Sequence, residues 1–202
     1  MQIRPFMMFT LAILCGCTDK NILYINKQQA IENVATPFSQ GAIKLILHTT
    51  PDLNSFKGIA NSCVLLIIQA QKLDSLNMAL SDPFELKALF SAAGSQNNIL
   101  KIDQYAAMPG QDITLHIDRS ESARYFAVVG GYYPFPQKQH MIIVEIPVIT
   151  EGSGWWNDYW IAKLATVTLN LSLGKNSINQ IKSEVIQPAI FANSTISTGM
   201  EY

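Results

Sequence analysis

The cysteines are the residues whose chemistry is clearest in this sequence. Cys17 follows Gly16 and the apolar run at residues 6–14, and Arg4 lies before that run. This order is typical of a lipobox, in which a signal peptide is cleaved before a cysteine whose thiol carries lipid. Cys15 is the poorer candidate, because a bulky leucine precedes it where cleavage needs a small residue. We therefore predict a signal peptide at 1–16 and lipid on Cys17; the alternative is an ordinary secretory signal with incidental cysteines.

The predicted cleavage and lipidation also suggest roles for Cys63 and for Thr18, the residue after the lipidated cysteine. Only Cys63 would accompany Cys17 in the mature chain, so we expect it to pack as a small core residue rather than form a disulfide. Each acyl methylene buried in a bilayer contributes roughly 0.8 kcal/mol, so two chains anchor a protein stably. By resemblance to other lipoproteins, Thr18 at the position after the lipid implies sorting to the outer membrane, on its periplasmic face.

The other reactive side chains show no spacing that supports catalysis. His116 and Asp118 lie two residues apart on one face of an expected strand, as solvated neighbours often do. The sequence has no His-Glu-x-x-His or Cys-x-x-Cys metal motif, no glycine loop for phosphate and no serine nucleophile elbow. The 14 basic and 15 acidic residues leave no positive block for nucleic acid. We expect no catalytic residue, metal, cofactor or nucleic-acid partner, and a lipid-anchored hydrolase is the least favoured class.

The densest aromatic group is the segment 155–160, Trp-Trp-Asn-Asp-Tyr-Trp. Aromatic rings beside carboxylates can form a surface for sugars or for a protein partner. The flanking glycine and asparagine favour a compact loop that folds back over the open end of a β-domain. A periplasmic ligand- or glycan-binding lipoprotein that uses this tryptophan-rich segment remains the alternative function.

The pattern of apolar residues predicts the elements that would carry these groups. Residues 17–40 are polar and predict a tether, with a turn of helix at 27–34. Apolar and polar residues alternate at 43–47, which predicts a half-buried strand, whereas 63–68 is continuously apolar, as in a strand covered on both faces. Between them, 49–61 is long for a hairpin connection, and long loops are often functional.

A helix is expected next, and then more strands. Asp82 resembles an N-cap, Pro83 a first helical residue and Glu85 the third residue of a capping box, so the helix would run from there and stop before Gly94. Further strands are expected at 102–106, 113–118, 125–133, 141–149, 166–173 and 177–181. Seven or eight short strands predict an antiparallel β-sandwich domain at 41–182, followed by a polar tail at 183–202.

Several short motifs, in this order, resemble the TssJ family, the outer-membrane lipoproteins of the type VI secretion system. The stretch from 43 to 131 carries Leu53-Asn54 and Gly58, Gln71-Lys72-Leu73-Asp74, Phe84-Glu85-Leu86, Pro109-Gly110, and a strand of the Tyr-x-x-Val-Val type at 125–133. The chain departs from the family where Pro134-Phe135-Pro136 and His140-Met141 replace an Arg and a Trp. The segment 151–163 resembles an insertion, and the end after Ile181 is additional.

The resemblance implies a mainly β, transthyretin-like sandwich with a short helical insertion and no catalysis. It also implies a partner, the periplasmic domain of the inner-membrane protein TssM, held through the loop between the first two strands. On this chain the implied partner-binding residues are Thr50, Pro51, Asp52, Leu53, Asn54, Ser55, Phe56, Lys57 and Gly58. Pro51, Leu53 and Phe56 would be apolar anchors, with Asp52, Asn54 and Lys57 as a polar rim. The alternative is a mobile loop without a partner.

Overall fold

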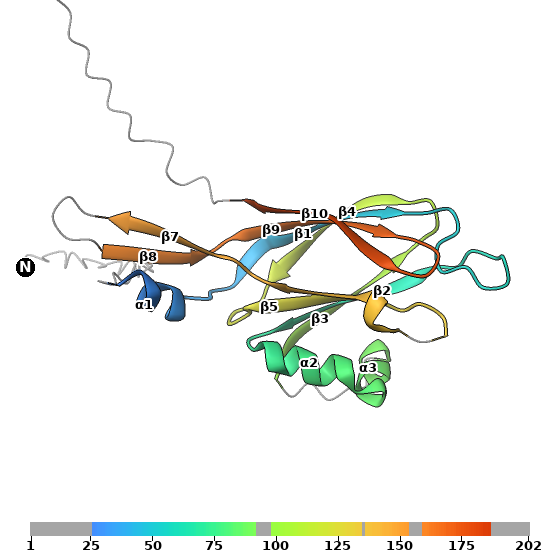
Figure 1. Ribbon diagram of the computed structural model, residues 1–202, viewed down its shortest axis with the longest axis horizontal. Coiled ribbons are helices and arrows are strands. Elements are labelled where there is room, and N and C mark those ends of the chain that lie inside the picture. The colour runs from blue at the N-terminus through green and yellow to red at the C-terminus, as the bar shows by residue number, and fades with distance from the viewer. Residues whose placement is uncertain (1–25, 92–97, 135, 154–158, 187–202) are drawn as a thin grey trace, which may run out of the picture.

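Two four-stranded sheets face each other, and a two-stranded ribbon extends from one end of them (Figure 1). The computed structural model describes residues 26–91, 98–134, 136–153 and 159–186. The fold is mainly β, as the sequence predicts. None of the helices in these ranges is long and apolar enough to cross a membrane.

The first sheet has the order β10-β9-β1-β4. Leu45 in β1 lies opposite Leu115 in β4 and Leu169 in β9. The β1–β9 pair is parallel, so the wholly antiparallel sandwich that we expected is wrong at this pair. The cause is that both strands enter the sheet from the ribbon end. The strands are β1 Ser39–Thr49, β4 Asp112–Arg119, β9 Thr166–Leu173 and β10 Ile178–Ile186.

The second sheet has the order β3-β2-β5-β6 and is antiparallel throughout. The strand expected at 141–149 is divided in two, because the chain leaves this sheet at Ile146 and Pro147, and proline lacks the N–H that a strand interior needs. Residues after Pro147 pair in the ribbon instead. The strands are β2 Cys63–Ala70, β3 Ile99–Ala107, β5 Tyr125–Gly130 and β6 Met141–Glu145; the 3-10 turn η1 Lys138–His140 precedes β6.

Strand β2 is covered on both faces, as its continuous apolar pattern predicts. Leu65 and Ile67 are fully buried against the opposite sheet, in the same cluster as Cys63. Leu66 and Ile68 are buried on the other face, beneath the helices α2 Leu73–Ser81 and α3 Pro83–Phe90. The helices cover this face through the fully or almost fully buried side chains Leu76, Leu80, Leu86 and Leu89.

Helix α3 begins where the sequence predicts. The side chain of Asp82 accepts hydrogen bonds from the backbone N–H groups of Phe84 (2.8 Å) and Glu85 (3.4 Å), which satisfies two donors at the helix start. Helix α2 was not expected, because its sequence, LDSLNMALS, contains Asp, Ser and Asn, which are weak helix formers. The burial of Leu76 and Leu80 stabilises it instead.

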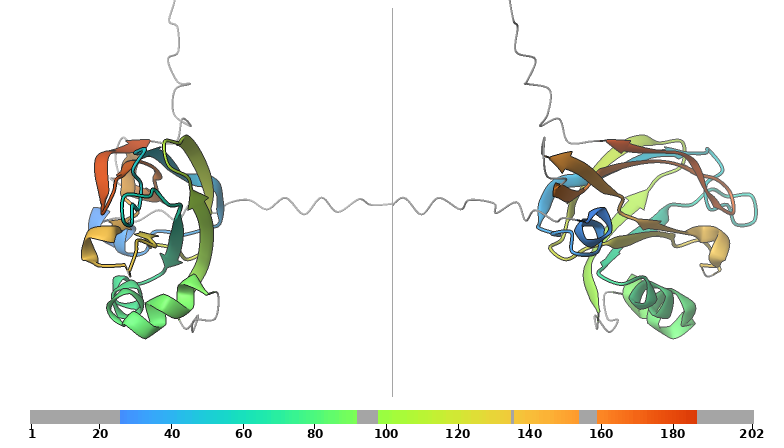
Figure 2. Two further views of the ribbon diagram at one scale, coloured as in Figure 1. Left: turned by 90° about the vertical axis from the view of Figure 1, so that its right-hand side faces the viewer. Right: turned by 60° about the vertical axis from the view of Figure 1, so that its left-hand side comes forward.

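The ribbon consists of β7 Val148–Ser153 and β8 Tyr159–Leu164. It runs beyond the sandwich (Figures 1 and 2). The capping loop that we expected falls mostly on residues 154–158, with Trp155 and Trp156, which lie outside the described residues. Helix α1 Lys27–Glu32 contacts both strands of the ribbon. The helical turn expected at 27–34 is therefore present.

The direction of each strand determines at which end of the sandwich the connection to the next strand lies. The β1–β2 loop, the β3–β4 turn, the β5–β6 connection and the β9–β10 turn all lie at the end away from the ribbon. The described chain begins at Asn26 beside the ribbon and stops at Ile186, where β10 extends four residues into the segment expected to be a tail. The two ends of the described chain therefore lie opposite the β1–β2 loop.

Candidate docking surface

The β1–β2 loop is fixed at its base by backbone hydrogen bonds to neighbouring turns. Thr50 N–H donates to the carbonyl of Leu173 (2.9 Å), and the Thr50 carbonyl accepts from Gly110 N–H (3.2 Å). Leu53, three residues on, is fully buried in the core between the sheets. The loop is thus closed onto the end of the sandwich by both polar and apolar contacts.

Asn54 connects this loop to the β5–β6 connection. Its Oδ1 accepts from the backbone N–H of Tyr133 (2.9 Å), and its Nδ2 donates to the carbonyl of Ser62 (2.9 Å). The residue is 8% exposed and has a φ of 44°, a left-handed conformation that asparagine tolerates better than most residues. One buried amide therefore positions two segments that are far apart in the sequence.

The apex of the loop is a tight two-residue turn. Phe56 and Ile59 exchange backbone hydrogen bonds of 2.9 and 3.0 Å. Between them, Lys57 has a φ of 51° and Gly58 a φ of 80°, which are the signs of a type I′ turn. The turn places the side chains of Phe56 and Ile59 opposite each other at the apex.

Tyr133 reaches this apex because β5 ends at Gly130 and a second glycine, Gly131, follows it. Gly131 N–H donates to the Val64 carbonyl (2.7 Å), so its backbone passes close to β2. A Cβ atom on Gly131 would lie 2.9 Å from the ring of Phe90 and 3.1 Å from the Val64 carbonyl oxygen. Only glycine allows this close approach, after which the chain turns outward at Tyr133.

Four side chains form one exposed surface at this end, which we call the loop tip: Phe56, Lys57, Ile59 and Tyr133. The exposed fractions of the three apolar or aromatic residues are 42%, 69% and 61%. The rings of Phe56 and Tyr133 are 4.4 Å apart between centroids, with 51° between their planes. Lys57 Nζ lies 5.4 Å from the centroid of the Phe56 ring. The tip is thus an apolar surface with one adjacent cation.

The structure divides the expected partner-binding residues into exposed and supporting positions. Pro51, Asp52, Phe56, Lys57 and Gly58 are exposed, and Thr50 and Ser55 are partly exposed. Leu53 and Asn54 are buried, so the expectation that they act as an apolar anchor and a rim residue is wrong. Leu53 is buried because it fills the end of the core, and Asn54 because it satisfies backbone groups.

Two residues of the tip were missed from the sequence. Ile59 could have been found, because Lys57-Gly58 is a plausible type I′ turn that pairs residues 56 and 59. Tyr133 lies 77 residues after Phe56, and no local pattern indicates their contact.

The role of Asn54 leads to a stability prediction. We expect Asn54→Ala to lower the free energy of unfolding by about 1–3 kcal/mol, because a buried N–H and a buried carbonyl lose their partner. Urea unfolding followed by circular dichroism measures this. Asn61→Ala is the matched control, because Asn61 is exposed and donates to the carbonyls of Asn54 and Ile59. If the Asn54→Ala protein were no less stable than Asn61→Ala, the Asn54 side chain would not be what holds the loop to the β5–β6 connection.

The thiol of Cys63 is buried and unreactive. Cys63 is fully buried, as expected of a core residue, and burial raises the pKa of its thiol to about 12. The neighbouring Tyr132 is also buried, and burial raises the pKa of its phenol. Both groups stay protonated at neutral pH, so neither supplies a nucleophile here.

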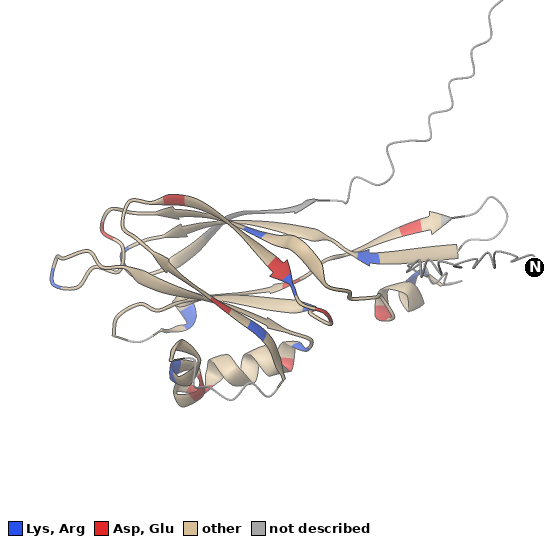
Figure 3. Cartoon of the chain, turned by 180° about the vertical axis from the view of Figure 1, so that it is seen from behind, with Lys and Arg blue, Asp and Glu red and all other residues tan. Residues whose placement is uncertain are grey.

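The histidines do not assemble a reactive centre in the described part of the chain. His116 is exposed, while Asp118 accepts a hydrogen bond from Gly41 N–H (2.8 Å). His140 is buried and its ring lies against Tyr132, with Nδ1 accepting from Gln137 N–H and Nε2 beside the Asn176 carbonyl. No three His, Cys, Asp or Glu residues within the described ranges gather as metal ligands. Charged side chains are scattered over the elements shown in Figure 3.

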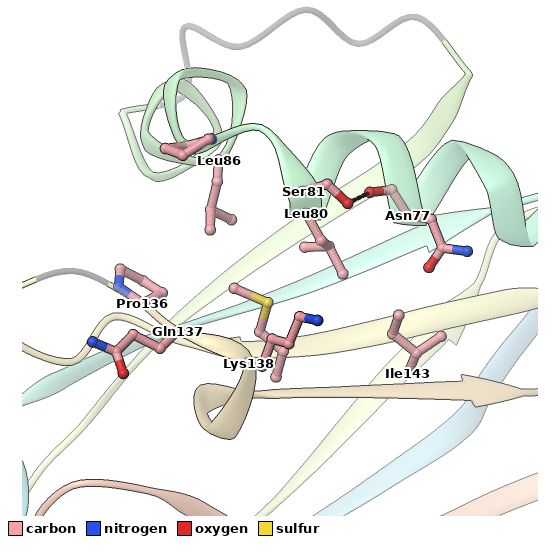
Figure 4. A pocket seen from close by; sticks show the side chains of 10 residues that line it. Asn77, Leu80, Ser81, Leu86, Pro136, Gln137, Lys138 and Ile143 are labelled. Carbon is pink, nitrogen blue, oxygen red and sulfur yellow. Dashed lines mark hydrogen bonds between the residues drawn. The ribbon is translucent and has the colours of Figure 1, made fainter.

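A groove of about 730 Å³ lies between α2, α3 and β6 (Figure 4). Leu80 and Leu86 point into it from the helices, and Ile143 from the edge strand. Lys138 is the one charged residue among those that line it. This mainly apolar lining offers no acid–base pair for catalysis.

The comparisons with known proteins agree with this architecture. Residues 42–176 match the family described as "Type VI secretion lipoprotein, VasD, EvfM, TssJ, VC_A0113". A search of curated proteins found no match. The family description names a lipoprotein component of a secretion system rather than an enzyme.

Solved structures share the fold at low sequence identity. The T6SS lipoprotein TssJ1 from Pseudomonas aeruginosa is 18% identical over 76% of this chain and 98% of its own, with a TM-score of 0.50. Serratia marcescens Lip, described as a membrane-bound component of the type VI secretion system, is 18% identical over 69% of this chain and 96% of its own (TM-score 0.50). A chain of a "Type VI membrane complex" is 15% identical over 69% and 97% (TM-score 0.51). The match over two thirds of the sequence means that this chain belongs to the TssJ family of type VI secretion lipoproteins.

Proposed function

We propose that the protein is anchored at the periplasmic face of the outer membrane by lipid on Cys17, and that its loop tip docks the periplasmic domain of a TssM-like inner-membrane protein. The observation that carries this proposal is the position of the tip. It is a fixed, exposed apolar surface at the end of the sandwich opposite to the described N-terminus. Attachment points at opposite ends of the domain would suit a protein that links two membranes.

The tip has the composition of an interface centre. Aromatic residues are enriched at the centres of protein interfaces, whereas lysine is depleted there and lies more often at the rim. Phe56 and Tyr133 already contact each other, so docking orders few side chains and loses little conformational entropy. Phe56, Ile59 and Tyr133 are therefore the proposed anchors, and Lys57 is the proposed polar neighbour.

The other residues of the loop take separate parts in the proposal. Pro51, Asp52 and Ser55 form the rim around the anchors. Thr50, Leu53, Asn54 and Gly58 hold the loop in shape, through the base hydrogen bonds, the core contact, the buried amide and the turn. This assignment keeps the loop as the partner-binding segment but gives fewer residues direct contact.

The strand lengths give the span of the proposed link. Strand β8 leads into β9, and the fourteen residue-to-residue steps from Tyr159 to Leu173 cover roughly 45 Å as extended chain. Leu173 accepts a hydrogen bond from Thr50 at the base of the loop. The domain would therefore carry the tip several nanometres away from the membrane that holds the lipid.

The direct test uses the unaltered protein in its own cells. Membranes are separated on a density gradient, the protein is purified under mild detergent, and its mass and bound proteins are determined. We expect the outer-membrane fraction, lipid mass on Cys17 and co-purification of the TssM-like protein. Recovery as an unlipidated protein, or in the inner membrane, would contradict the anchor; lipidated protein free of the partner would contradict the docking role.

A further inference from the structure

Helix α1 attaches the start of the described chain to the ribbon. Ala30 is fully buried, and Lys27 Nζ lies 5.3 Å from the centroid of the Trp160 ring in β8. Asn26 caps the helix by accepting from Gln28 N–H (2.8 Å). Trp160 is one residue from the start of β8, so the chain reaches the domain at the far end of the ribbon.

This attachment places the ribbon close to the lipid. The ten peptide units from Cys17 to Lys27 span at most about 36 Å when fully extended. The loop tip is beyond that distance, since roughly 45 Å separates the ribbon from the base of the loop. The ribbon end is therefore held closer to the lipid than the loop tip is.

The ribbon end also has side chains that suit a membrane surface. Tyr159 and Trp160 are partly exposed. Gly152 lies opposite Trp160 and has no side chain to cover the ring of Trp160. A Cβ atom on Gly152 would lie 3.8 Å from that ring. Tyrosine and tryptophan concentrate at the membrane–water interface, where the ring is half buried and the polar edge stays wet. The nearby Lys27 can extend its ammonium toward lipid headgroups.

The charges on the ribbon do not oppose such contact. Glu151 and Lys163 project from one face, and Lys27 and Glu32 lie on the helix beside the other. The formal charges of these four residues cancel, so the described parts of the ribbon and helix α1 together carry no net charge that an anionic bilayer would repel.

We propose that the end of the β7–β8 ribbon, with Gly152, Tyr159 and Trp160, lies in the headgroup region of the membrane that holds the lipid of Cys17. The partner of this surface is the lipid bilayer itself. The inference rests on the proposed lipid anchor and adds to it a second attachment point. With two points of contact the domain stands on its ribbon and presents the loop tip away from the bilayer.

Other exposed apolar side chains define the competing orientation. Phe84 is 85% exposed and Met78 is 72% exposed on the helices α3 and α2. If these residues met the bilayer, the domain would lie on its helical side. The experiment must therefore compare the ribbon end, the helical side and the loop tip.

Tryptophan fluorescence in vesicles makes this comparison. The full chain is produced in a Gram-negative host, purified in detergent and reconstituted into vesicles of phosphatidylethanolamine and phosphatidylglycerol, with either plain or brominated acyl chains. Trp155→Phe with Trp156→Phe leaves Trp160 as the single tryptophan. Two matched variants replace all three tryptophans by phenylalanine and carry Phe56→Trp or Phe84→Trp.

We expect brominated lipid to reduce the emission of Trp160 by about half, and that of the other two variants by less than about a tenth. Equal emission of Trp160 in both vesicles, or stronger quenching of Phe84→Trp, would overturn the ribbon contact. Mass spectrometry of the same samples separates the two claims. An unmodified Cys17 would overturn the anchor and the ribbon contact with it, whereas a lipidated protein with unquenched Trp160 would overturn the ribbon contact alone.

Discussion

Phe56→Asp is expected to weaken binding of the periplasmic domain of the TssM-like partner by about a hundredfold, since truncating or charging a central interface residue costs about 3 kcal/mol. The substitution removes the ring that contacts Tyr133 and places a carboxylate where the partner excludes water. Phe56 is 42% exposed in the free protein, so we expect the fold to persist.

Isothermal titration calorimetry with the purified partner domain measures this loss, and thermal unfolding reports on the fold. Phe84→Asp is the matched control, because it introduces the same charge at an exposed phenylalanine on α3. We expect its affinity to equal that of the unaltered protein. If Phe56→Asp bound as tightly as Phe84→Asp, the tip would not be the docking surface.

Cys17→Ser is expected to abolish secretion while leaving partner affinity unchanged. Without the thiol no acyl chain can be attached, and each buried methylene that is lost removes roughly 0.8 kcal/mol of membrane binding. The loop tip lies at the opposite end of the domain from the described N-terminus, so its geometry does not depend on the lipid. Secretion of a type VI substrate measures the first effect, titration of the purified partner domain measures the second, and membrane fractionation checks that the anchor is lost.

Cys63→Ala controls for the loss of a thiol. It removes a fully buried sulfur and should cost about 1–2 kcal/mol of stability, but it leaves the lipid in place. We expect secretion to continue at the level that the remaining folded protein allows. Secretion that survived Cys17→Ser would show that the lipid is not needed for the function.

The elements that could be predicted from the sequence are those fixed by local patterns. The alternation at 43–47 marks β1, and the continuous apolar run at 63–68 marks β2 because that strand is covered by a sheet and by helices. Asp82 and Pro83 mark the start of α3 because a cap is a local arrangement. In each case the pattern that marks the element lies within a few consecutive residues.

The parts that were missed depend on contacts between distant segments. The parallel pairing of β1 with β9 follows from the ribbon and α1 entering at the same end, which no strand pattern records. Helix α2 exists because Leu76 and Leu80 are buried beneath a sheet, and this outweighs its weak propensity.

The same division applies to the candidate site. The sequence places Phe56, Lys57 and Gly58 in a loop with turn residues, and the structure has them at its exposed apex. It could not show that Leu53 turns inward, because an apolar residue in a loop can equally be an anchor or a core residue. The contact of Tyr133 with Phe56 depends on the hydrogen bond from Tyr133 N–H to Asn54, a long-range effect.

The central claim is that the lipid and the loop tip act as the two ends of one link, so both must be present in the same molecule. Co-expression of Cys17→Ser with Phe56→Asp, in cells that lack the unaltered protein, tests this directly, with secretion of a type VI substrate as the measurement. If each chain joins the membrane to its partner, the mixture cannot secrete, because one variant has lost the anchor and the other has lost the docking surface. Secretion restored by the pair, when neither variant secretes alone, would contradict the account.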